Sequence, residues 1–261
     1  MPDPLAQADP VALVTGASRG IGEAVARELA GGGFRLCLGA RSLAACDTLA
    51  AELRAQGREA LGLELDVRDR RSVEQATRAA LDRFGRIDLL VANAGIGGGE
   101  LFAAMSDEAV ADLVDTNLLG VLRCVSAVLP AMRRQGGGAI VVIASVAGEV
   151  ALPASSIYAA TKAGVLRFAQ GLRQEVRRDG IRVTAILPGF VRTEMTGGVA
   201  VPMPGPEVVA RAVLRAYRRG PRRIVVPGWY LPLIWLARLA PPLVDLIGRR
   251  ILREGRQARQ G

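Results

Sequence analysis

Tyr158 and Lys162 stand four residues apart in a segment with helical periodicity, so both side chains should project from one face of a helix. A free phenol has a pKa of about 10, but a neighbouring ammonium group favours the phenolate and lowers that pKa. Lys162 is the single lysine among 34 basic residues, and the chain contains no histidine. The composition excludes a Ser-His-Asp triad and imidazole acid–base chemistry. We therefore expect Tyr158 to transfer protons, with Lys162 lowering its pKa.

These two residues must be positioned by a scaffold of alternating strands and helices. Short, largely apolar runs predict strands at 11–15, 34–39, 60–66, 88–92, 139–144, 182–187 and 223–226. Helical periodicity predicts helices at 23–30, 43–56, 72–84, 101–134 (interrupted near Pro130), 157–178 and 207–219. Apolar strands that alternate with helices indicate a parallel sheet covered on both faces. The expected fold class is α/β, a single doubly wound, Rossmann-like domain with a mostly parallel seven-stranded sheet.

A glycine-rich segment, Thr15-Gly16-Ala17-Ser18-Arg19-Gly20-Ile21-Gly22, separates the first predicted strand from the first helix. Glycines there allow a tight turn, and the helix N-terminus offers free N–H groups and a partial positive charge to a pyrophosphate. A plain glycine turn is the alternative. The position directly between a strand and a helix favours the phosphate site.

The spacing of this loop resembles the nucleotide loop of the short-chain dehydrogenase/reductase superfamily, and the resemblance extends over residues 11–193. Further motifs follow in the family's order, although Ala92 stands where the family has a first Asn before Asn93. By this resemblance the cofactor-binding residues are Gly16, Ser18, Arg19, Gly20, Ile21, Gly22, Arg41, Asp66, Val67, Asn93, Ala94, Gly95, Tyr158, Lys162, Pro188, Gly189, Val191 and Thr193. The catalytic residues would be Asn117, Ser145, Tyr158 and Lys162.

The resemblance also assigns roles. Tyr158 would be the general acid in carbonyl reduction, and Lys162 would also bond the nicotinamide ribose. Ser145 would hydrogen-bond the substrate carbonyl, with Ser155 and Ser156 weighed as turn residues. Asn117 would hold a water in the proton relay, although a buried helix Asn satisfied by backbone is the alternative.

Three further cofactor contacts follow from the same resemblance. Asp66 would contact the adenine. Val191 and Thr193 would meet the nicotinamide carboxamide.

The end of the second predicted strand bears on the choice of cofactor. NAD-specific sites usually place a carboxylate there to hold the ribose 2′-OH, but this strand is followed by Arg41 and no acid. Arg41 and Arg19 together would suit a 2′-phosphate, because guanidinium groups form bidentate bonds to phosphate. The alternative is two solvated arginines in an arginine-rich protein. NADP(H) is the expected cofactor, and no metal is expected.

The C-terminal part of the chain carries the excess charge. Of the net +9, residues 211–261 contribute 12 arginines against Asp245 and Glu254. We expect a catalytic domain at 1–228 and, at 229–261, an apolar and Arg-rich extension that is not an independent domain. Trp, Tyr and Leu beside Arg suit a lipid interface. The favoured interpretation is a terminal helix packed over the substrate cleft or on a subunit neighbour, with membrane association as the alternative, and nucleic acid is not an expected partner.

Other features of the sequence limit the expected substrate class and cellular compartment. The segment 195–206 is glycine- and proline-rich and largely apolar, which predicts a mobile lid and a lipophilic carbonyl or alcohol substrate. The three cysteines are expected to be buried thiols: Cys37, Cys46 and Cys124. Reduced thiols fit a cytoplasmic protein. Peripheral contact at the inner face of the membrane is a further interpretation. The N-terminus shows no secretory signal, and the apolar run 224–237 is too short to span a bilayer.

Three functions compete on this evidence. The leading prediction is an NADP(H)-dependent enzyme that interconverts a carbonyl and an alcohol. The second is a 3-oxoacyl-[acyl-carrier-protein] reductase, although Val225-Val226-Pro227-Gly228 departs from that subfamily's usual ending. The third, a non-catalytic NADP-binding protein at a membrane surface, is disfavoured by the complete catalytic set. By analogy with the family, the chain is expected to form a homodimer or homotetramer.

Overall fold

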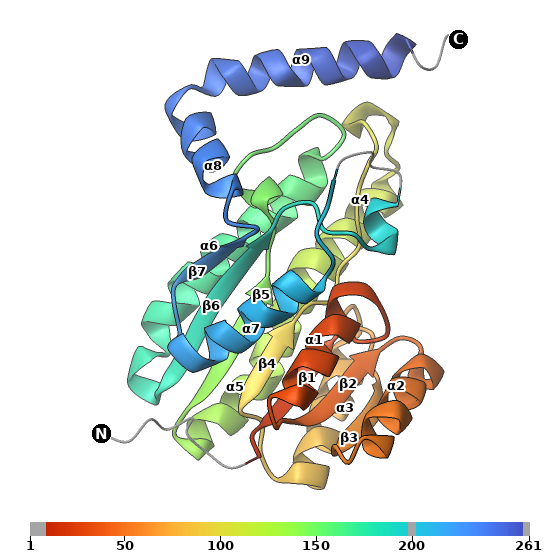
Figure 1. Ribbon diagram of the computed structural model, residues 1–261, viewed down its shortest axis with the longest axis vertical. Helices are drawn as coiled ribbons and strands as arrows, with labels where there is room; N and C mark the ends of the chain where they lie inside the picture. Colours follow the sequence, from red (N-terminus) through yellow and green to blue (C-terminus); the bar gives the residue numbers. More distant parts are fainter. Residues whose placement is uncertain (1–8, 198–201, 258–261) are drawn as a thin grey trace.

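The computed structural model describes residues 9–197 and 202–257, and the side chains of 251–257 are outside this description. Seven strands form one sheet in the order β3-β2-β1-β4-β5-β6-β7, and every neighbouring pair is parallel (Figure 1). The strands are β1 (Val11–Thr15), β2 (Arg35–Ala40), β3 (Ala60–Glu64), β4 (Leu89–Ala92), β5 (Gly138–Ile143), β6 (Ile181–Pro188) and β7 (Arg223–Val226). The sequence-based prediction of a doubly wound, seven-stranded α/β fold is confirmed.

Helices cover both faces of this sheet, and each face has its own apolar core. The helices are α1 (Gly20–Gly31), α2 (Leu43–Ala55), α3 (Arg70–Phe84), α4 (Asp107–Val114), α5 (Gly120–Gln135), α6 (Ser156–Glu175), α7 (Glu207–Arg219), α8 (Tyr230–Leu239) and α9 (Pro241–Gln257). Buried side chains of α3, α5 and α6 form one core, and those of α1, α2 and α7 form the other. This double cover explains why the strands are largely apolar.

The long helix predicted at 101–134 is divided differently from the prediction. Ser106 caps α4 by accepting the Ala109 N–H at 3.2 Å, so the helix begins only after this residue. A π-helical turn, Asp115–Leu119, then joins α4 to α5. The expected interruption near Pro130 was wrong, because α5 continues through it to Gln135. Burial of Val128 and its neighbours on both sides of the proline stabilises the helix despite the lost hydrogen bond.

The sheet order determines where a ligand can bind. Strands β1 and β4 are neighbours, and the chain winds outward from them in opposite directions, so their carboxyl ends form a topological switch point. The glycine loop follows β1, and Asn93-Ala94-Gly95 follows β4. Ser145 lies just after β5, and Pro188 ends β6. The predicted motifs are therefore gathered at one edge of the sheet.

The last two helices leave the body of the molecule. Figure 1 shows α8 rising from the end of β7 and α9 lying across that end of the molecule. Within the described residues, the stretch Asp107–Gln135 is long and apolar enough to cross a membrane, but it forms helices packed on the sheet. The pair α8 and α9 passes the same test jointly, with a bend of 109° between the two helices.

Candidate active site

The glycine loop has a backbone that only glycine fits well. Gly16 has a φ of +65°, and a Cβ atom there would lie 2.9 Å from the Cα of Ala94. A Cβ atom on Gly22 would lie 2.0 Å from the carbonyl oxygen of Gly16. The residue before α1, Arg19, makes no side-chain cap, so the N-terminal amides of α1 remain available to an anion. This arrangement fits a pyrophosphate.

Hydrogen bonds join this loop to the loop after β4. The buried Thr15 hydroxyl accepts the N–H groups of Asn93 at 3.0 Å and Ala94 at 3.1 Å. In return the Asn93 amide donates to the carbonyls of Thr15 at 3.0 Å and Gly16 at 3.2 Å. Thr15 is therefore a positioning residue that the sequence-based site omitted, although it opens the recognised loop motif.

The residues expected around the adenine and its ribose lie at the ends of β2 and β3. The Asp66 carboxylate pairs with Arg68 at 2.8 Å, and this hydrogen bonding lowers the pKa of Asp66, with a smaller electrostatic effect from Arg41. Val67 is buried against Gly120, and its carbonyl accepts from Arg123 at 3.3 Å. Sequence reasoning did not identify Arg68 as the partner of this carboxylate.

The two arginines expected at a 2′-phosphate have different surroundings. Arg41 is exposed at the end of β2 and close enough to Asp66 to influence its pKa. Arg19 is exposed in the glycine loop and forms an ion pair with Glu194, which follows Thr193. That both guanidinium groups converge on one phosphate stays a prediction.

Lys162 is held deep in the site. Its ammonium group donates to the carbonyl of Ile143 at 3.0 Å, and the residue is only 4% exposed. A Cβ atom on Gly95 would lie 3.5 Å from Lys162 Nζ and 3.0 Å from Asn117 Oδ1, so the three residues adjoin one another. Burial lowers the pKa of Lys162 to about 8.

Tyr158 lies beside this lysine, with Lys162 Nζ 5.7 Å from the centre of the phenol ring. Burial raises the pKa of Tyr158, and a hydrogen bond with Ser145 only partly opposes that rise. The sequence-based prediction of a lowered pKa was wrong, because desolvation of the phenolate outweighs an ammonium at this distance. A phenol that keeps its proton is suited to act as a general acid.

Ser145 joins the tyrosine to the loop after β6. Its hydroxyl accepts the Ala147 N–H at 3.1 Å and donates to the carbonyl of Pro188 at 3.4 Å. The same hydroxyl interacts with Tyr158. Ser155 and Ser156 instead lie at the start of α6, as turn and first helical residue.

Asn117 lies in the π-helical turn and is fully buried. Its side-chain oxygen accepts the Ile96 N–H at 2.8 Å, and its NH₂ group donates to the Ile96 carbonyl at 2.9 Å. The side chain is thus satisfied by backbone and fixes the loop that carries Gly95. Its role in holding a water stays a prediction.

The segment after β6 reaches back to the glycine loop. A Cβ atom on Gly20 would lie 3.6 Å from the Thr193 methyl group. The Thr196 hydroxyl accepts the Thr193 N–H at 3.0 Å and donates to the carbonyl of the buried Val191 at 2.7 Å. Of the lid expected at 195–206, residues 198–201 lie outside the described part of the structure.

Tyr230 is a contact that sequence reasoning missed. Its hydroxyl accepts the Phe190 N–H at 3.2 Å, and a Cβ atom on Gly189 would lie 2.1 Å from its ring. Forty residues separate the two segments, so no local pattern could have identified the contact. Tyr230 holds the Pro188-Gly189 loop from the side of α8.

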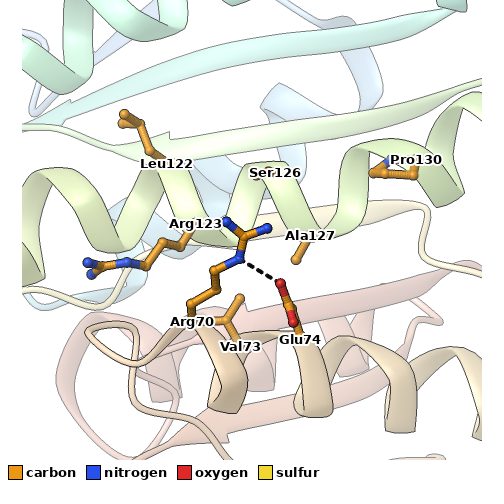
Figure 2. Close-up of a pocket in the computed structure, with 8 residues that line it drawn as sticks. All are labelled: Arg70, Val73, Glu74, Leu122, Arg123, Ser126, Ala127 and Pro130. Atoms are coloured by element: carbon orange, nitrogen blue, oxygen red, sulfur yellow. Dashed lines mark hydrogen bonds and ion pairs between the residues drawn. The ribbon is translucent and has the colours of Figure 1, made fainter.

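A separate groove, between α3 and α5, lies outside this site (Figure 2). An ion pair between Arg70 and Glu74, at 2.7 Å, lies at one wall. The groove is lined by Arg70, Val73, Glu74, Leu122, Arg123, Ser126, Ala127 and Pro130. None of the predicted site residues is among them.

Within residues 9–197 and 202–257, no group of three or more acidic or cysteine residues could hold a metal ion.

Two proteins with related sequences have named activities. The chain is 46% identical over 187 residues to the monensin polyketide synthase putative ketoacyl reductase of Streptomyces virginiae, covering 71% of this chain and 72% of that protein. It is 43% identical over 187 residues to the 3-oxoacyl-[acyl-carrier-protein] reductase of Synechocystis sp., covering 71% of this chain and 76% of the relative.

Solved structures share this fold over most of the chain. An alcohol dehydrogenase from Thermococcus sibiricus, complexed with 5-hydroxy-NADP, has a TM-score of 0.74 at 34% identity and covers 83% of this chain and 95% of its own. A short-chain dehydrogenase/reductase from Burkholderia phymatum, in complex with NAD, has a TM-score of 0.82 at 28% identity, with coverage of 90% and 95%. Actinorhodin polyketide ketoreductase with NADPH has a TM-score of 0.78 at 35% identity, with coverage of 84% and 96%.

The family model described as short chain dehydrogenase matches residues 10–201. This range includes the glycine loop, the Asn93 loop and the residues around Tyr158 and Lys162. The chain therefore belongs to the short-chain dehydrogenase family, and it is an oxidoreductase.

Proposed function

We propose that this chain is an NADP(H)-dependent enzyme that interconverts a carbonyl and an alcohol on a lipophilic substrate. The observation that carries the proposal is the buried, single lysine of the chain beside the phenol ring of Tyr158, whose hydroxyl interacts with Ser145. A proton donor and a hydroxyl that can bind an oxygen therefore lie together at the carboxyl edge of the sheet. This pair suits protonation of a carbonyl oxygen.

The residues present fit NADP(H). The N-terminus of α1 has no side-chain cap, which suits a pyrophosphate, and Arg41 stands where an acid would favour NAD. Two of the solved structures with the same fold carry NADPH or an NADP derivative, whereas another carries NAD. The cofactor assignment therefore rests on the residues of this chain, and above all on Arg41 at the end of β2.

The chemistry divides between cofactor and protein. When bound, the nicotinamide supplies or accepts a hydride. Ser145 would hold the substrate oxygen, and Tyr158 would give that oxygen its phenolic proton. Lys162 would bind the nicotinamide ribose and, in its protonated state, stabilise the phenolate that remains on Tyr158 after proton transfer. In the oxidative direction the same groups take the proton back.

A second substrate class has specific support. The named relatives are a 3-oxoacyl-[acyl-carrier-protein] reductase and a putative ketoacyl reductase of a polyketide synthase. A 3-oxoacyl thioester carries a carbonyl on an otherwise apolar chain, so the same site could reduce it. This reading is the alternative to a free lipophilic ketone or aldehyde.

The decisive experiment measures NADPH and NADH consumption with aldehydes, cyclic ketones, steroids and 3-oxoacyl thioesters. Turnover with NADPH on at least one lipophilic carbonyl is expected. Preference for the acyl-carrier-bound thioester over every free carbonyl would select the second substrate class. No turnover on any carbonyl, with NADPH binding intact, would contradict the proposed activity.

We further propose that the extension 229–261 is not an independent domain and that the protein is a cytoplasmic homodimer or homotetramer. The first point is supported by Tyr230 and Ile234, which pack against the body of the fold. The assembly proposal rests on family membership, and light scattering of the purified chain measures it directly. Peripheral contact of 229–261 with a membrane belongs to the same proposal.

A further inference from the structure

The helices α8 and α9 expose an apolar surface, which we call the α8–α9 surface. It is defined by Trp235 and Leu239 of α8, which are 54% and 80% exposed, and by Leu246 of α9, which is 63% exposed. Trp229, just before α8, is 66% exposed. Leaving apolar side chains this large in water costs free energy. A surface that carries several of them marks an interaction site.

This surface is fixed to the body at defined points. Ile234 enters the apolar core, and Tyr230 contacts the loop after β6. Glu149, whose side chain is almost buried, pairs with both Arg223 of β7 and Arg238 of α8. These apolar and charged contacts join α8 to the body of the fold.

The anchors also place the surface beside the reacting groups. A Cβ atom on Gly248 of α9 would lie 3.4 Å from Pro153, in the loop that connects Ser145 to Tyr158. Figure 1 shows α8 and α9 at the same end of the molecule as the carboxyl ends of β5, β6 and β7.

The composition of the surface favours a lipid occupant. Both tryptophans of the chain, Trp229 and Trp235, lie on it, and amphipathic rings of this kind prefer the membrane–water interface. The sequence 229–261 holds six arginines and two acidic residues, a charge that anionic lipid headgroups would attract. Exposed Arg249 lies three residues after the exposed Leu246, so a basic and an apolar side chain share one face of α9.

The geometry of the two helices favours the membrane interface over a straight span. The α8 helix has 10 residues, whereas a span needs about 20, and the two helices meet at 109°. A pair bent so sharply, with charge on its second helix, is suited to lie in the plane of the interface.

We propose that the α8–α9 surface docks on an anionic lipid surface and thereby turns the Tyr158 side of the fold toward the bilayer. A lipophilic carbonyl substrate would then reach the site directly from the lipid. The docking deepens the membrane contact proposed above for 229–261, and the second part rests also on the proposed carbonyl activity.

The test uses the intrinsic fluorescence of the full chain, since its two tryptophans both lie on the surface in question. Vesicles of phosphatidylcholine with phosphatidylglycerol should shift the emission to the blue and co-sediment with the protein. Vesicles of phosphatidylcholine alone should bind more weakly. The double variant Leu239→Glu/Leu246→Glu should weaken binding to the anionic vesicles by at least about tenfold, because two leucines that would enter the lipid are exchanged for two anions.

Leu43→Glu is the matched control. Leu43 is also exposed, at 40%, but lies at the start of α2, and its variant should bind vesicles as the wild type does. With a ketone dissolved in the vesicles, NADPH consumption should fall for the double variant, and with a water-soluble carbonyl it should stay unchanged.

Two outcomes would overturn the docking proposal. One is wild-type protein that neither shifts its emission nor co-sediments with anionic vesicles. The other is a dimer in solution that the double variant converts to a monomer while vesicle binding is absent, because the occupant would then be a second copy of the chain. Failure of the proposed function looks different: vesicle binding would persist without turnover on any carbonyl.

Discussion

The surroundings of Lys162 and the α8–α9 surface are opposite departures from the usual distribution of polar and apolar groups. At Lys162 a cation is buried, with the Ile143 carbonyl as its hydrogen-bond partner. On α8 and α9, leucines and tryptophans are exposed to water. Each arrangement costs free energy in the isolated fold. Such costs are expected at functional positions, where a ligand or partner compensates them.

Replacing the proton donor should give the largest effect. Tyr158→Phe keeps the ring but removes the group that protonates the substrate oxygen, so turnover should fall by about 10²–10⁴-fold. NADPH binding, followed by fluorescence titration, should persist. Tyr230→Phe is the matched control, since it also removes one phenolic hydroxyl but only loses the bond to Phe190, worth about 1 kcal/mol. Equal losses of turnover in the two variants would contradict the role of Tyr158.

Within α8 itself the comparison can be tested with two substitutions on one helix. Ile234 is 1% exposed and Leu239 is 80% exposed. Ile234→Ala should lower the free energy of unfolding by about 2–5 kcal/mol, whereas Leu239→Ala should change it by less than about 0.5 kcal/mol. Chemical denaturation of the lipid-free protein measures both. A large loss from Leu239→Ala would mean that this side chain is covered in solution.

The cofactor preference should respond to a change at the end of β2. Arg41→Asp removes a cation that would bind the 2′-phosphate and adds a carboxylate that suits a ribose hydroxyl. NADPH affinity should fall by about 10- to 100-fold, and the preference should move toward NADH. An unchanged NADPH dissociation constant would refute the assignment of Arg41. The same titration on an Arg19→Ala variant would show whether the ion pair with Glu194 leaves Arg19 free to take part.

The buried lysine predicts a pH dependence. Burial lowers the pKa of Lys162 to about 8, so the free enzyme loses this cation as the pH rises through that value. If cofactor binding and proton transfer need the ammonium form, kcat/KM for carbonyl reduction should be level below pH 8 and fall about tenfold per unit above it. Burial raises the pKa of Tyr158, so the phenol should not cause this decline. A level profile to high pH would contradict a role for the protonated lysine.

Sequence reasoning predicted the fold, and it selected candidate site residues that the structure gathers at one edge of the sheet, because both depend on local patterns. Apolar runs and glycine spacing specify a parallel strand and a phosphate-binding turn within a few residues. The two wrong predictions, the pKa of Tyr158 and the helix break near Pro130, have physical reasons that lie outside local patterns. The direction of the Tyr158 pKa depends on how much water surrounds the ring, and the path of the helix through Pro130 depends on packing by its neighbours.

The sequence by itself determined the residue types that could react: a tyrosine, the only lysine of the chain, and a glycine loop after an apolar strand. It also placed the excess of arginine and both tryptophans near the C-terminus. Only the tertiary structure decided that Lys162 is buried against Ile143, that Tyr230 holds the Gly189 loop, and that α8 and α9 keep an apolar face in water. Burial and contact between distant segments are properties of the packed chain, and no local pattern encodes them.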